Sequence, residues 1–350
     1  MRTPPELPDG AIAALLREGY GLRLTQSTFL PLGADPDTFA FQVVADGAQA
    51  YFLKLRRGPF REVAARMPAF LYASGVRNVM APLPTAVGTL WTIAHGFAWM
   101  LYPYFEGRDG YEVALSRAQW ARLGETFRAV HSTRLPPDLA ALVPRETYSP
   151  RWRDAARAFD REANLDHDDP AGARLAELWR RNRPEIGRVV ERAAELARRL
   201  EAMRLEQVVC HADLHGANVL VGPPGSDDAL TVVDWDEVIL APKERDLMSV
   251  GAGLFGGWTP GGCCPDPAME EPWFSEGYGP AEVDPVALAY YRYERIVADF
   301  AAYADEIWNQ RIGPEDREIG VSQLAGQFQP GHVVDLAHRT YQRLSYSRRL

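Results

Sequence analysis

Two short segments place oxygen-bearing side chains between apolar runs. The first, VVCHADLHGANVLV at residues 208–221, contains His211, Asp213 and Asn218 in the spacing H-x-D-x-x-x-x-N. The second, LTVVDWDE at residues 230–237, reads as a strand that ends at Asp234. An aspartate can accept the proton of an attacking hydroxyl or aim that hydroxyl, and carboxylate and amide oxygens are ligands that Mg²⁺ prefers. These types predict Asp213 as the group that handles a hydroxyl, and Asn218 and Asp234 as metal ligands.

A lysine and a glutamate upstream complete a set of parts for phosphoryl transfer. Only two of the 38 basic residues are lysine, Lys54 and Lys243. Lys54 lies on a predicted strand, where its point charge could hold the α- and β-phosphates of a nucleotide. Glu62, at the start of the next predicted helix, could orient that lysine. Lysine, glutamate, H-x-D-x-x-x-x-N and a strand-ending aspartate follow one another in the chain order of a phosphoryl-transfer site.

Each of these residues has a simpler interpretation when it is taken alone. A single lysine on a strand is usually solvated, and Glu62 could merely favour a helix N-terminus through the helix dipole. Asp234 could end a strand, and His215 could be a packing residue of a loop. Their joint occurrence, in order and in the expected structural contexts, favours the catalytic interpretation.

The first third of the chain has the pattern of a small antiparallel sheet. Two β-like runs surround an Asp46-Gly47 turn, which is typical of a hairpin. Proline and glycine break regular structure after the last run, so the linker is predicted at Tyr102–Gly107. The predicted elements are a helix at Ala11–Gly21, strands at Thr38–Val44 and Ala50–Leu55, a helix at Phe60–Ser74, and strands at Leu90–Ala94 and Phe97–Tyr102.

The rest of the chain is mainly helical by its apolar spacing. The predicted helices are Ser116–His131, Arg151–Ala163, Ala171–Asn182, Glu185–Arg204, Glu244–Ala252, Asp284–Trp308, Pro314–Gly326 and Val333–Arg348, with a short strand at Leu230–Val233. The fold class is therefore α+β with two lobes. Residues 1–103 would form a mostly antiparallel nucleotide-binding lobe with one main helix, and residues 104–350 a larger helical lobe that holds the catalytic loop and the acceptor site.

Composition excludes several classes of protein. The net charge of −9 and pI of about 5.4 argue against a nucleic-acid partner and suit a cationic small ligand. No run of about 18 apolar residues predicts a membrane span, and the N-terminus does not read as a secretory signal. The three cysteines, two of them adjacent at Cys263-Cys264, provide neither a disulfide framework nor a zinc site. We expect a cytoplasmic protein with no evident protein partner.

The motifs resemble those of the aminoglycoside phosphotransferase family, which shares the fold of protein kinases. The resemblance rests on VVCHADLHGANVLV, LTVVDWDE and APKERDLMSVG, and it spans about Tyr20 to Gly253. Within the family, PLGADPDTFAF, YFLKLRRG and VDWDEVILAPKERDLM are similar to the spectinomycin phosphotransferases. The resemblance implies a two-lobe protein-kinase-like fold with Asp213 as catalytic base.

The resemblance also assigns the remaining cofactor positions. Asn218 and Asp234 would bind the metal, and Lys54 would bind phosphate with Glu62 as its helix partner. The nucleotide loop would lie at Gly33–Thr38 and the adenine-contacting hinge at Leu101–Tyr104. The candidate nucleotide-binding residues in these two segments are Gly33, Ala34, Asp35, Thr38, Leu101, Tyr102 and Tyr104.

Three departures from the protein-kinase pattern argue against a kinase that is switched by phosphorylation. The nucleotide loop lacks G-x-G-x-x-G, and Ala212 stands where an arginine would tether a phosphorylated activation loop. Trp235-Asp236 stands where protein kinases have Phe-Gly. Asp236 is either a further metal-site carboxylate or a group that acts behind the ligands.

The acceptor site is the least determined part of the prediction. Between Leu247 and Tyr291 there are six acidic residues and no lysine or arginine, together with several aromatic residues. Such a segment could bind a polyhydroxylated amine, or it could be an irregular surface loop with solvated charges. The candidate substrate contacts are Asp213, His215, Glu270, Glu271 and Trp273. A second acidic run, LDHDDP at residues 165–170, is better explained as a solvated loop.

The sequence thus predicts an enzyme that uses ATP or GTP with Mg²⁺ to phosphorylate a hydroxyl of a small cationic molecule. The favoured acceptor is an aminocyclitol or aminoglycoside antibiotic such as spectinomycin, which would confer resistance. The alternative within enzymes is a metabolic or biosynthetic kinase for another hydroxylated compound. The alternative of another class is a nucleotide-binding regulator without turnover, against which the retained Asp213 argues.

Overall fold

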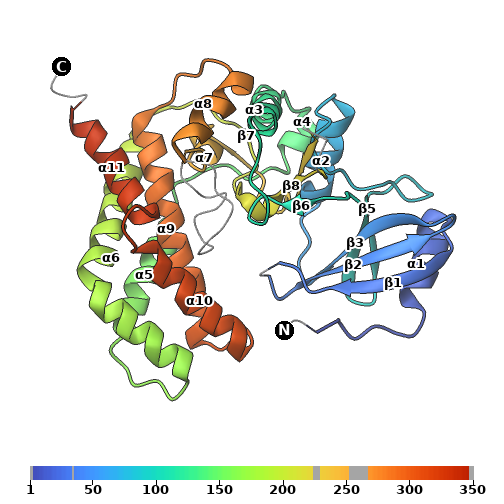
Figure 1. Ribbon diagram of the computed structural model, residues 1–350, viewed down its shortest axis with the longest axis horizontal. Coiled ribbons are helices and arrows are strands. Elements are labelled where there is room, and N and C mark those ends of the chain that lie inside the picture. Colours follow the sequence, from blue (N-terminus) through green and yellow to red (C-terminus); the bar gives the residue numbers. More distant parts are fainter. Residues whose placement is uncertain (1–2, 34, 224–228, 252–266, 347–350) are drawn as a thin grey trace.

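The computed structural model describes residues 3–33, 35–223, 229–251 and 267–346. These residues form two lobes, a smaller lobe built on a sheet and a larger, mainly helical lobe (Figure 1). The α+β, two-lobe fold class is therefore confirmed. Within the described residues, no helix is both long and apolar enough to cross a bilayer.

The smaller lobe is a five-stranded antiparallel sheet in the order β1-β2-β3-β5-β4. The strands are β1 (Leu24–Leu30), β2 (Thr38–Ala45), β3 (Gln49–Arg57), β4 (Thr92–Ala94) and β5 (Phe97–Pro103). The predicted hairpin is present, and its turn has positive φ at Gly47 and Ala48. Helix α1 (Ala11–Tyr20) covers one face, where Leu16, Leu53 and Trp99 are fully buried. The sequence did not predict β1, because four of its seven residues are exposed and leave little apolar pattern.

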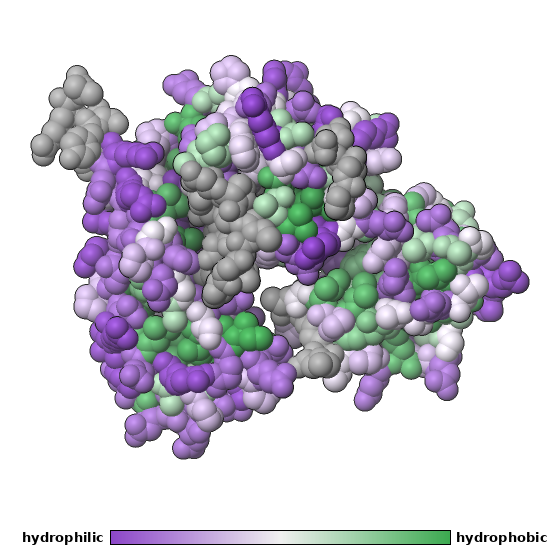
Figure 2. Space-filling model, viewed as in Figure 1, coloured by the Kyte–Doolittle hydropathy of each residue, from purple (hydrophilic) through white to green (hydrophobic). Residues whose placement is uncertain are grey.

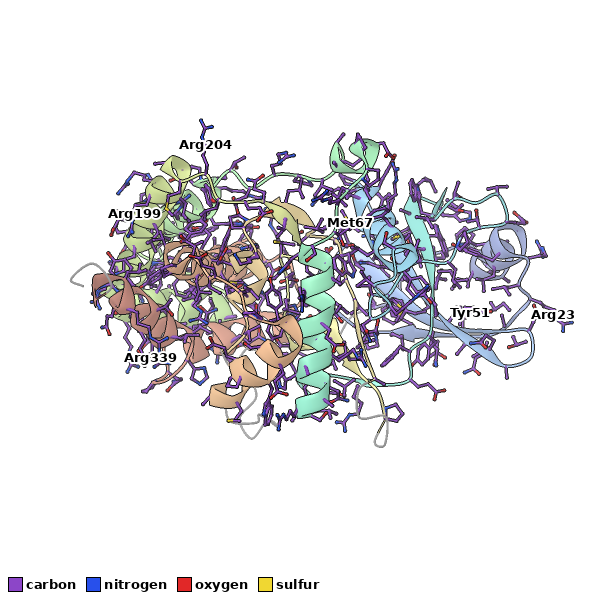
Figure 3. The ribbon with its side chains drawn as sticks, turned by 90° about the horizontal axis from the view of Figure 1, so that it is seen from above. Arg23, Tyr51, Met67, Arg199, Arg204 and Arg339 are labelled. Atoms are coloured by element: carbon purple, nitrogen blue, oxygen red, sulfur yellow. The ribbon has the colours of Figure 1, made fainter. Side chains whose placement is uncertain are left out.

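Helix α2 (Val63–Ala73) lies between the sheet and the larger lobe (Figure 1). It begins three residues later than predicted, after Glu62 at its N-cap. Met67, labelled in Figure 3, belongs to the same core as Val232 of the larger lobe, whereas Ala65 packs against Met100 of β5. The lobes therefore share a core through this helix, and we keep the boundary between residues 103 and 104 as a proposal.

The larger lobe is organised around one long helix. Helix α9 (Pro285–Trp308) packs against five other described helices, α5 (Arg151–Glu162), α6 (Pro170–Ala202), α7 (Glu244–Leu247), α10 (Pro314–Gln327) and α11 (Val333–Tyr346). Asp284 caps α9 by accepting hydrogen bonds from two backbone N–H groups. Arginines such as Arg204 and Arg339 project outward from this lobe (Figure 3). Helix α7 is shorter than predicted, and another short helix, α4, spans Pro137–Ala140.

Helix α6 corrects one prediction. The segments predicted as two helices, Ala171–Asn182 and Glu185–Arg204, form a single helix with Pro184 inside it. Proline removes one intrahelical hydrogen bond and usually breaks a helix. Here the apolar stripe continues across it, since Trp179 and Ile186 are both buried in the core against α9. Tertiary packing therefore maintains the helix through the proline.

Helix α8 (Pro267–Tyr278) lies in the segment 247–291, for which the sequence predicts no regular structure before residue 284 beyond the helix at Glu244–Ala252. It packs closely against α3 (Arg117–His131), which begins with the predicted serine cap in a complete capping box. Gly277 makes this approach possible, because a Cβ there would lie 1.8 Å from the carbonyl oxygen of Ala121. Gly124 does the same from the other helix, with a Cβ position 2.1 Å from the carbonyl oxygen of Phe274.

Two small sheets support the polar segments identified from the sequence. One has the order β6-β8-β9, with strands at Arg108–Asp109, Val219–Val221 and Leu230–Val232, and the other pairs β7 (Val208–Cys210) with β10 (Ile239–Ala241). The segment 211–218 connects β7 to β8, and the segment 233–238 connects β9 to β10. Both polar segments are therefore short connections held at each end by hydrogen-bonded strands, as the sequence predicted for the first of them.

Candidate active site

The two polar segments lie at the junction of the lobes, opposite β3. The face of the molecule seen in Figure 2 is deeply hollowed between the smaller and larger lobes. Lys54 reaches across the junction from β3 to the segment that follows β9. The structure thus brings together residues that are about 180 positions apart in the chain.

Lys54 is buried between two carboxylates. Its Nζ donates hydrogen bonds to Asp234 Oδ1 and Asp236 Oδ2, each at 2.9 Å. Burial opposes the charged form of the lysine, but the charges of the two aspartates raise the pKa of Lys54 well above its ordinary value. The pKa of Asp234 is lowered by the same contact, although burial opposes the shift. The contact therefore favours the charged forms of both Lys54 and Asp234.

Asp213 is the second charged centre. Asn218 Nδ2 donates to the carbonyl oxygen of Asp213 at 2.9 Å and to its Oδ2 at 3.3 Å. His215 Nε2 lies 3.4 Å from the same Oδ2, and its ring stacks on Tyr111. Burial opposes ionisation of Asp213, but His215 and the guanidinium of Arg295 hold its pKa well below the ordinary value. The carboxylate is therefore an ionised hydrogen-bond acceptor, as hydroxyl handling requires.

Arg295 was not predicted from the sequence. It lies on α9, and its Nη1 is 2.5 Å from Asp213 Oδ1. No local pattern identifies it, because it is one of many arginines on amphipathic helices. Its one local signal is the spacing to Asp299, four residues further along the same helix, which permits an ion pair.

Asp246 holds the backbone of the catalytic segment 211–218. It was also not predicted as a site residue. Its carboxylate accepts hydrogen bonds from the backbone N–H groups of His211 and Ala212, at 2.9 and 2.7 Å. His131 Nε2 lies 3.1 Å from the same carboxylate, and His131 Nδ1 lies 2.7 Å from the hydroxyl of Tyr278. Burial opposes ionisation, but the hydrogen bond with His131 helps to lower the pKa of Asp246.

Two non-glycine residues of the site have a strained backbone. Ala212 and Asp234 have positive φ, at 70° and 61°, in the left-handed region that non-glycine residues rarely adopt. Such conformations persist when surrounding contacts hold them, and they cluster at functional sites. The carboxylate of Asp246 on Ala212 and the ammonium of Lys54 on Asp234 are contacts of this kind.

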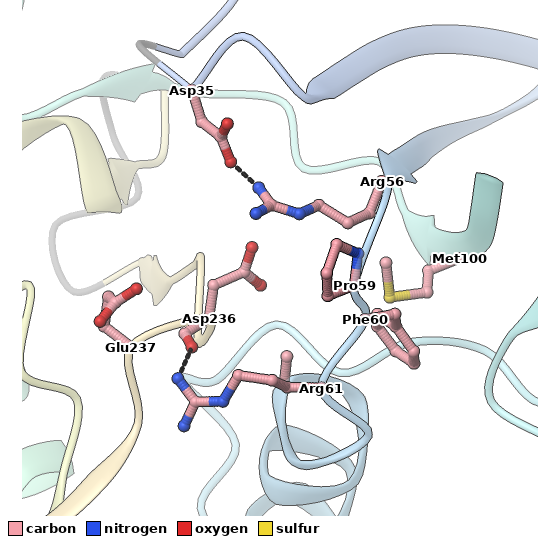
Figure 4. Close-up of a pocket in the computed structure, with 9 residues that line it drawn as sticks. Asp35, Arg56, Pro59, Phe60, Arg61, Met100, Asp236 and Glu237 are labelled. Atoms are coloured by element: carbon pink, nitrogen blue, oxygen red, sulfur yellow. Dashed lines mark hydrogen bonds and ion pairs between the residues drawn. The ribbon is translucent and has the colours of Figure 1, made fainter. Parts of the chain in front are cut away.

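A pocket lies beside Asp236 at the mouth of the predicted nucleotide loop (Figure 4). Asp35 pairs with Arg56 across it, and Arg61 Nη1 donates to the carbonyl oxygen of Asp236 at 3.2 Å. Asp35 also accepts hydrogen bonds from the backbone of Asp37 and the hydroxyl of Thr38. Asp35 and Thr38 thus belong to a hydrogen-bonded turn. Gly33 has a positive φ of 79°, and Ala34 lies outside the described residues.

Glu62 is not the partner of Lys54 in this structure. It stands at the N-cap of α2, about half exposed, and its nearest opposite charge is Arg66 at 3.9 Å. The two carboxylates on Lys54 come instead from the segment after β9. Glu62 occupies the expected position at the start of the helix, but the sequence does not determine where that helix lies between the lobes.

The predicted hinge has a definite backbone arrangement. Leu101 and Tyr102 are buried on β5, and the carbonyl of Leu101 accepts a hydrogen bond from the backbone N–H of Leu83 at 2.7 Å. Burial raises the pKa of Tyr102 above its ordinary value. Tyr104 follows β5 and is partly exposed at the start of the linker. All three therefore lie where the chain passes from one lobe to the other.

The predicted acceptor residues of α8 do not join this cluster. Glu270 is fully buried, and its Oε2 accepts a hydrogen bond from the backbone N–H of Gly251 at 3.1 Å. Glu271 is exposed, and Trp273 packs partly buried against the core beneath α3. Glu270 thus has a structural contact where a substrate contact was expected. Of the predicted acceptor residues, the structure brings only Asp213 and His215 together.

The oxygen set near Lys54 fits a hard divalent cation. Asp234 and Asp236 each use one carboxylate oxygen on Lys54 and keep a second, and both side chains are at least one-third exposed. Asn218 turns its nitrogen toward Asp213, which directs its amide oxygen away from that carboxylate. Two carboxylates and an amide oxygen are donors suited to Mg²⁺. Bound there, the ion would neutralise phosphate charge and align the nucleotide.

A second cluster contains atoms of types that can bind metal, but its residues are less suited to do so than those near Lys54. His131, Cys210 and Asp246 bring potential ligand atoms within 4.8 Å of one another, and all three are buried. Burial raises the pKa of the Cys210 thiol well above its ordinary value, which disfavours the thiolate that binds metal. Asp246 is occupied by the backbone N–H groups already described. We therefore interpret this cluster as structural support for the catalytic segment.

A family model and solved structures both show similarity to phosphotransferases. A family model described as the phosphotransferase enzyme family (APH) matches residues 27–263. A crystal structure of the spectinomycin phosphotransferase APH(9)-Ia with ADP and spectinomycin is 31% identical, with a TM-score of 0.86, covering 97% of this chain and 100% of that one. A structure of an amicoumacin kinase in complex with AMP-PNP, Ca²⁺ and Ami is 16% identical, with a TM-score of 0.61, covering 93% of this chain and 95% of that one. A search of curated protein sequences gives no match.

Proposed function

The chain belongs to the phosphotransferase enzyme family, and from this premise we propose that it transfers the γ-phosphoryl group of ATP to a hydroxyl of an aminocyclitol such as spectinomycin. The observation that carries the chemistry is the position of Asp213. Its ionised carboxylate lies across the lobe junction from Lys54 and Asp234. Family membership makes the chain a phosphotransferase with an alcohol group as acceptor; the acceptor and the residue roles are the proposal.

In this proposal Lys54 holds phosphate oxygens, and Asn218, Asp234 and Asp236 hold Mg²⁺. Asp236 thereby becomes a ligand, because it contacts Lys54 at the same distance as Asp234 does. The turn at Gly33–Thr38 covers the phosphates, and the backbone of Leu101–Tyr104 contacts the adenine. The relatives of known structure hold ADP, AMP or AMP-PNP, so we propose ATP as donor in preference to GTP.

The transfer itself needs little covalent chemistry from the protein. The acceptor oxygen forms a bond to the γ-phosphorus while the bond from that phosphorus to the β–γ bridging oxygen breaks, and ADP leaves with that electron pair. The hydroxyl proton passes to Asp213 and then to water. Catalysis then consists of aiming the hydroxyl and stabilising charge, which rigid connections between short strands favour.

The acceptor is inferred from the similarity to spectinomycin phosphotransferase over almost the full length of both chains. The alternative is a small-molecule kinase for another hydroxylated compound, because acceptor residues lie in segments that vary within such folds. A nucleotide-binding regulator is disfavoured, since a binding module has no use for an ionised carboxylate held across the lobe junction from the phosphate lysine.

The test is ADP release by the purified protein with Mg-ATP, in the presence of spectinomycin, aminoglycosides or simple amino alcohols. Asp213→Ala should abolish stimulation while ATP binding, measured by calorimetry, stays within about twofold. Asp166→Ala, which changes an exposed aspartate of the LDHDDP segment, is the matched control and should behave as wild type. Stimulation by another acceptor would discard spectinomycin and keep the chemistry. Turnover that survives Asp213→Ala would refute the proposed base.

A further inference from the structure

We propose that Arg295 is a positioning residue that fixes the catalytic carboxylate, so that Asp213 Oδ2 is the oxygen that receives the acceptor hydroxyl. This inference rests on the proposed function, because it assigns the task of Asp213 to one of its two oxygens. It adds a residue from α9 that no motif of the sequence contains.

Arg295 is held in place by contacts from two helices. Its Nη1 is 2.5 Å from Asp213 Oδ1, and its Nε donates to Asp299 Oδ1 at 2.9 Å. Asp299 is in turn held by Gln327 of α10, whose Nε2 donates to Oδ2 at 3.1 Å. The guanidinium is therefore gripped from its own helix and from the next one. A planar, permanently charged group held in this way has little freedom to follow a moving carboxylate.

The two carboxylate oxygens of Asp213 have different partners. Oδ1 makes the short, charge-assisted contact with Arg295. Among the residues that the structure describes, Oδ2 contacts Asn218 at 3.3 Å and His215 at 3.4 Å, and both distances are long for hydrogen bonds with nitrogen donors. Arg295 thus occupies the first oxygen and leaves the second with capacity for a strong hydrogen bond. The hydroxyl of the acceptor would provide that bond.

Arg295 and the two carboxylates beside it are partly exposed to solvent. The side chains of Arg295, Asp213 and Asp299 are 33%, 28% and 19% exposed. A pair of similar chemistry elsewhere on α9, Glu294 with Arg153, has side chains only 8% and 4% exposed and lies within the core. The Arg295 group therefore lies at the wall of the lobe junction, where an acceptor can reach it, and not among packed side chains.

Removal of the guanidinium would release two carboxylates against each other. Burial raises the pKa of Asp299, and the neighbouring charge of Asp213 acts in the same direction. Without Arg295 the two aspartates would repel, and Asp213 would be drawn toward its weaker partners. Arg295 therefore keeps the carboxylate both in place and turned in one direction.

The experiment is a double-mutant cycle on ADP release, measured with water alone and with spectinomycin as acceptor. Arg295→Met should lower kcat by about 10–100-fold, as expected when a catalytic group is misplaced, and leave KM for ATP unchanged. In the Asp213→Asn background the same change should have little further effect, since the carboxylate it positions is gone. Arg295→Lys should restore activity only partly, and millimolar guanidinium chloride should partly rescue Arg295→Ala.

The control variant is Arg311→Met, which breaks an Arg–Asp pair of 2.9 Å near the end of α9 and should leave kinetics unchanged. Equal losses from Arg295→Met in both backgrounds would overturn the inference, because a merely structural role lowers both rates. A wild-type kcat in Arg295→Met would overturn it as well. If instead Asp213→Asn leaves all turnover intact, Asp213 is not the catalytic base, and the proposed function itself fails. If spectinomycin does not stimulate but the cycle on water shows coupling, only the acceptor falls.

Discussion

Asp246→Asn is the substitution that best tests how the catalytic segment is held. The carboxylate lies at 1% exposure and accepts from two backbone N–H groups through its two oxygens, while His131 contacts one of them. Asparagine is almost isosteric but offers one acceptor oxygen and one NH₂ group. Whichever way the amide is oriented, one backbone N–H of the segment 211–212 faces another donor.

The magnitude follows from these contacts. Breaking a buried charged group's network costs about 3–5 kcal/mol, and a buried donor left without an acceptor accounts for about 1–3 kcal/mol of that. Domains of ordinary stability unfold at about 5–15 kcal/mol, so the variant should fold but with a clearly lower unfolding midpoint. A shift of about 1 Å in the adjacent Asp213 would lower kcat by about 100-fold. Lys54 belongs to another segment, so KM for ATP should change little.

The assay combines urea unfolding, followed by tryptophan fluorescence, with steady-state ADP release. Asp335→Asn is the matched control, because its exposed carboxylate also accepts from a backbone N–H, that of Gly331 at 2.7 Å. That change should stay within about 0.5 kcal/mol. An Asp246→Asn protein with wild-type stability and kcat would refute the reasoning, and so would a loss of stability without any loss of kcat.

Three further predictions concern other parts of the molecule. Lys54→Met removes the cation between two carboxylates, so KM for Mg-ATP should rise at least about tenfold while KM for the acceptor stays unchanged. Steady-state titrations measure both constants, and an unchanged KM for Mg-ATP would contradict the phosphate role of Lys54. Gly277→Ala places a Cβ 1.8 Å from a carbonyl oxygen of α3 and should lower the free energy of unfolding by about 1–3 kcal/mol. The control Gly187→Ala, whose Cβ meets nothing within 4 Å, should raise it by up to about 1 kcal/mol. Urea unfolding measures both changes. Burial raises the pKa of Glu294 to about 7 from 4.5, so ionising it in the folded state is unfavourable. The wild type should therefore lose up to about 3 kcal/mol relative to Glu294→Gln as pH rises through 4.5–7; equal gaps in unfolding midpoints at pH 5 and pH 8 would mean that Arg153 keeps the carboxylate ionised.

Local chemistry was readable from the sequence because it depends on neighbours in the chain. The hairpin around Gly47, the serine cap of α3 and the polar segment 211–218 all follow from spacings of a few residues. The structure places each of them in the expected context. Apolar runs flanking the polar segment also predicted that strands would hold it, and β7 and β8 do so.

Long-range partners were not readable, and this explains the two main differences. Glu62 was matched to Lys54 by helix position, but the partner carboxylates come from a segment about 180 residues away. The irregular composition of residues 247–291 hid α8, whose regularity depends on a close fit between two glycines and α3. Such choices are made by packing between elements, for which one sequence carries no local signal.

The site contains the same charge arrangement twice. Lys54 lies between two aspartates near the proposed metal, and Arg295 lies between Asp213 and Asp299 near the proposed acceptor. In each group one basic side chain lies between two carboxyl groups, so acidic groups outnumber basic ones. This excess suits a divalent cation that also carries phosphate in the first group, and a cationic acceptor next to the attacking hydroxyl in the second. The chemical difference between the cations fits this division, because a lysine can turn its point charge toward phosphate while the fixed fork of an arginine holds a carboxylate in one orientation.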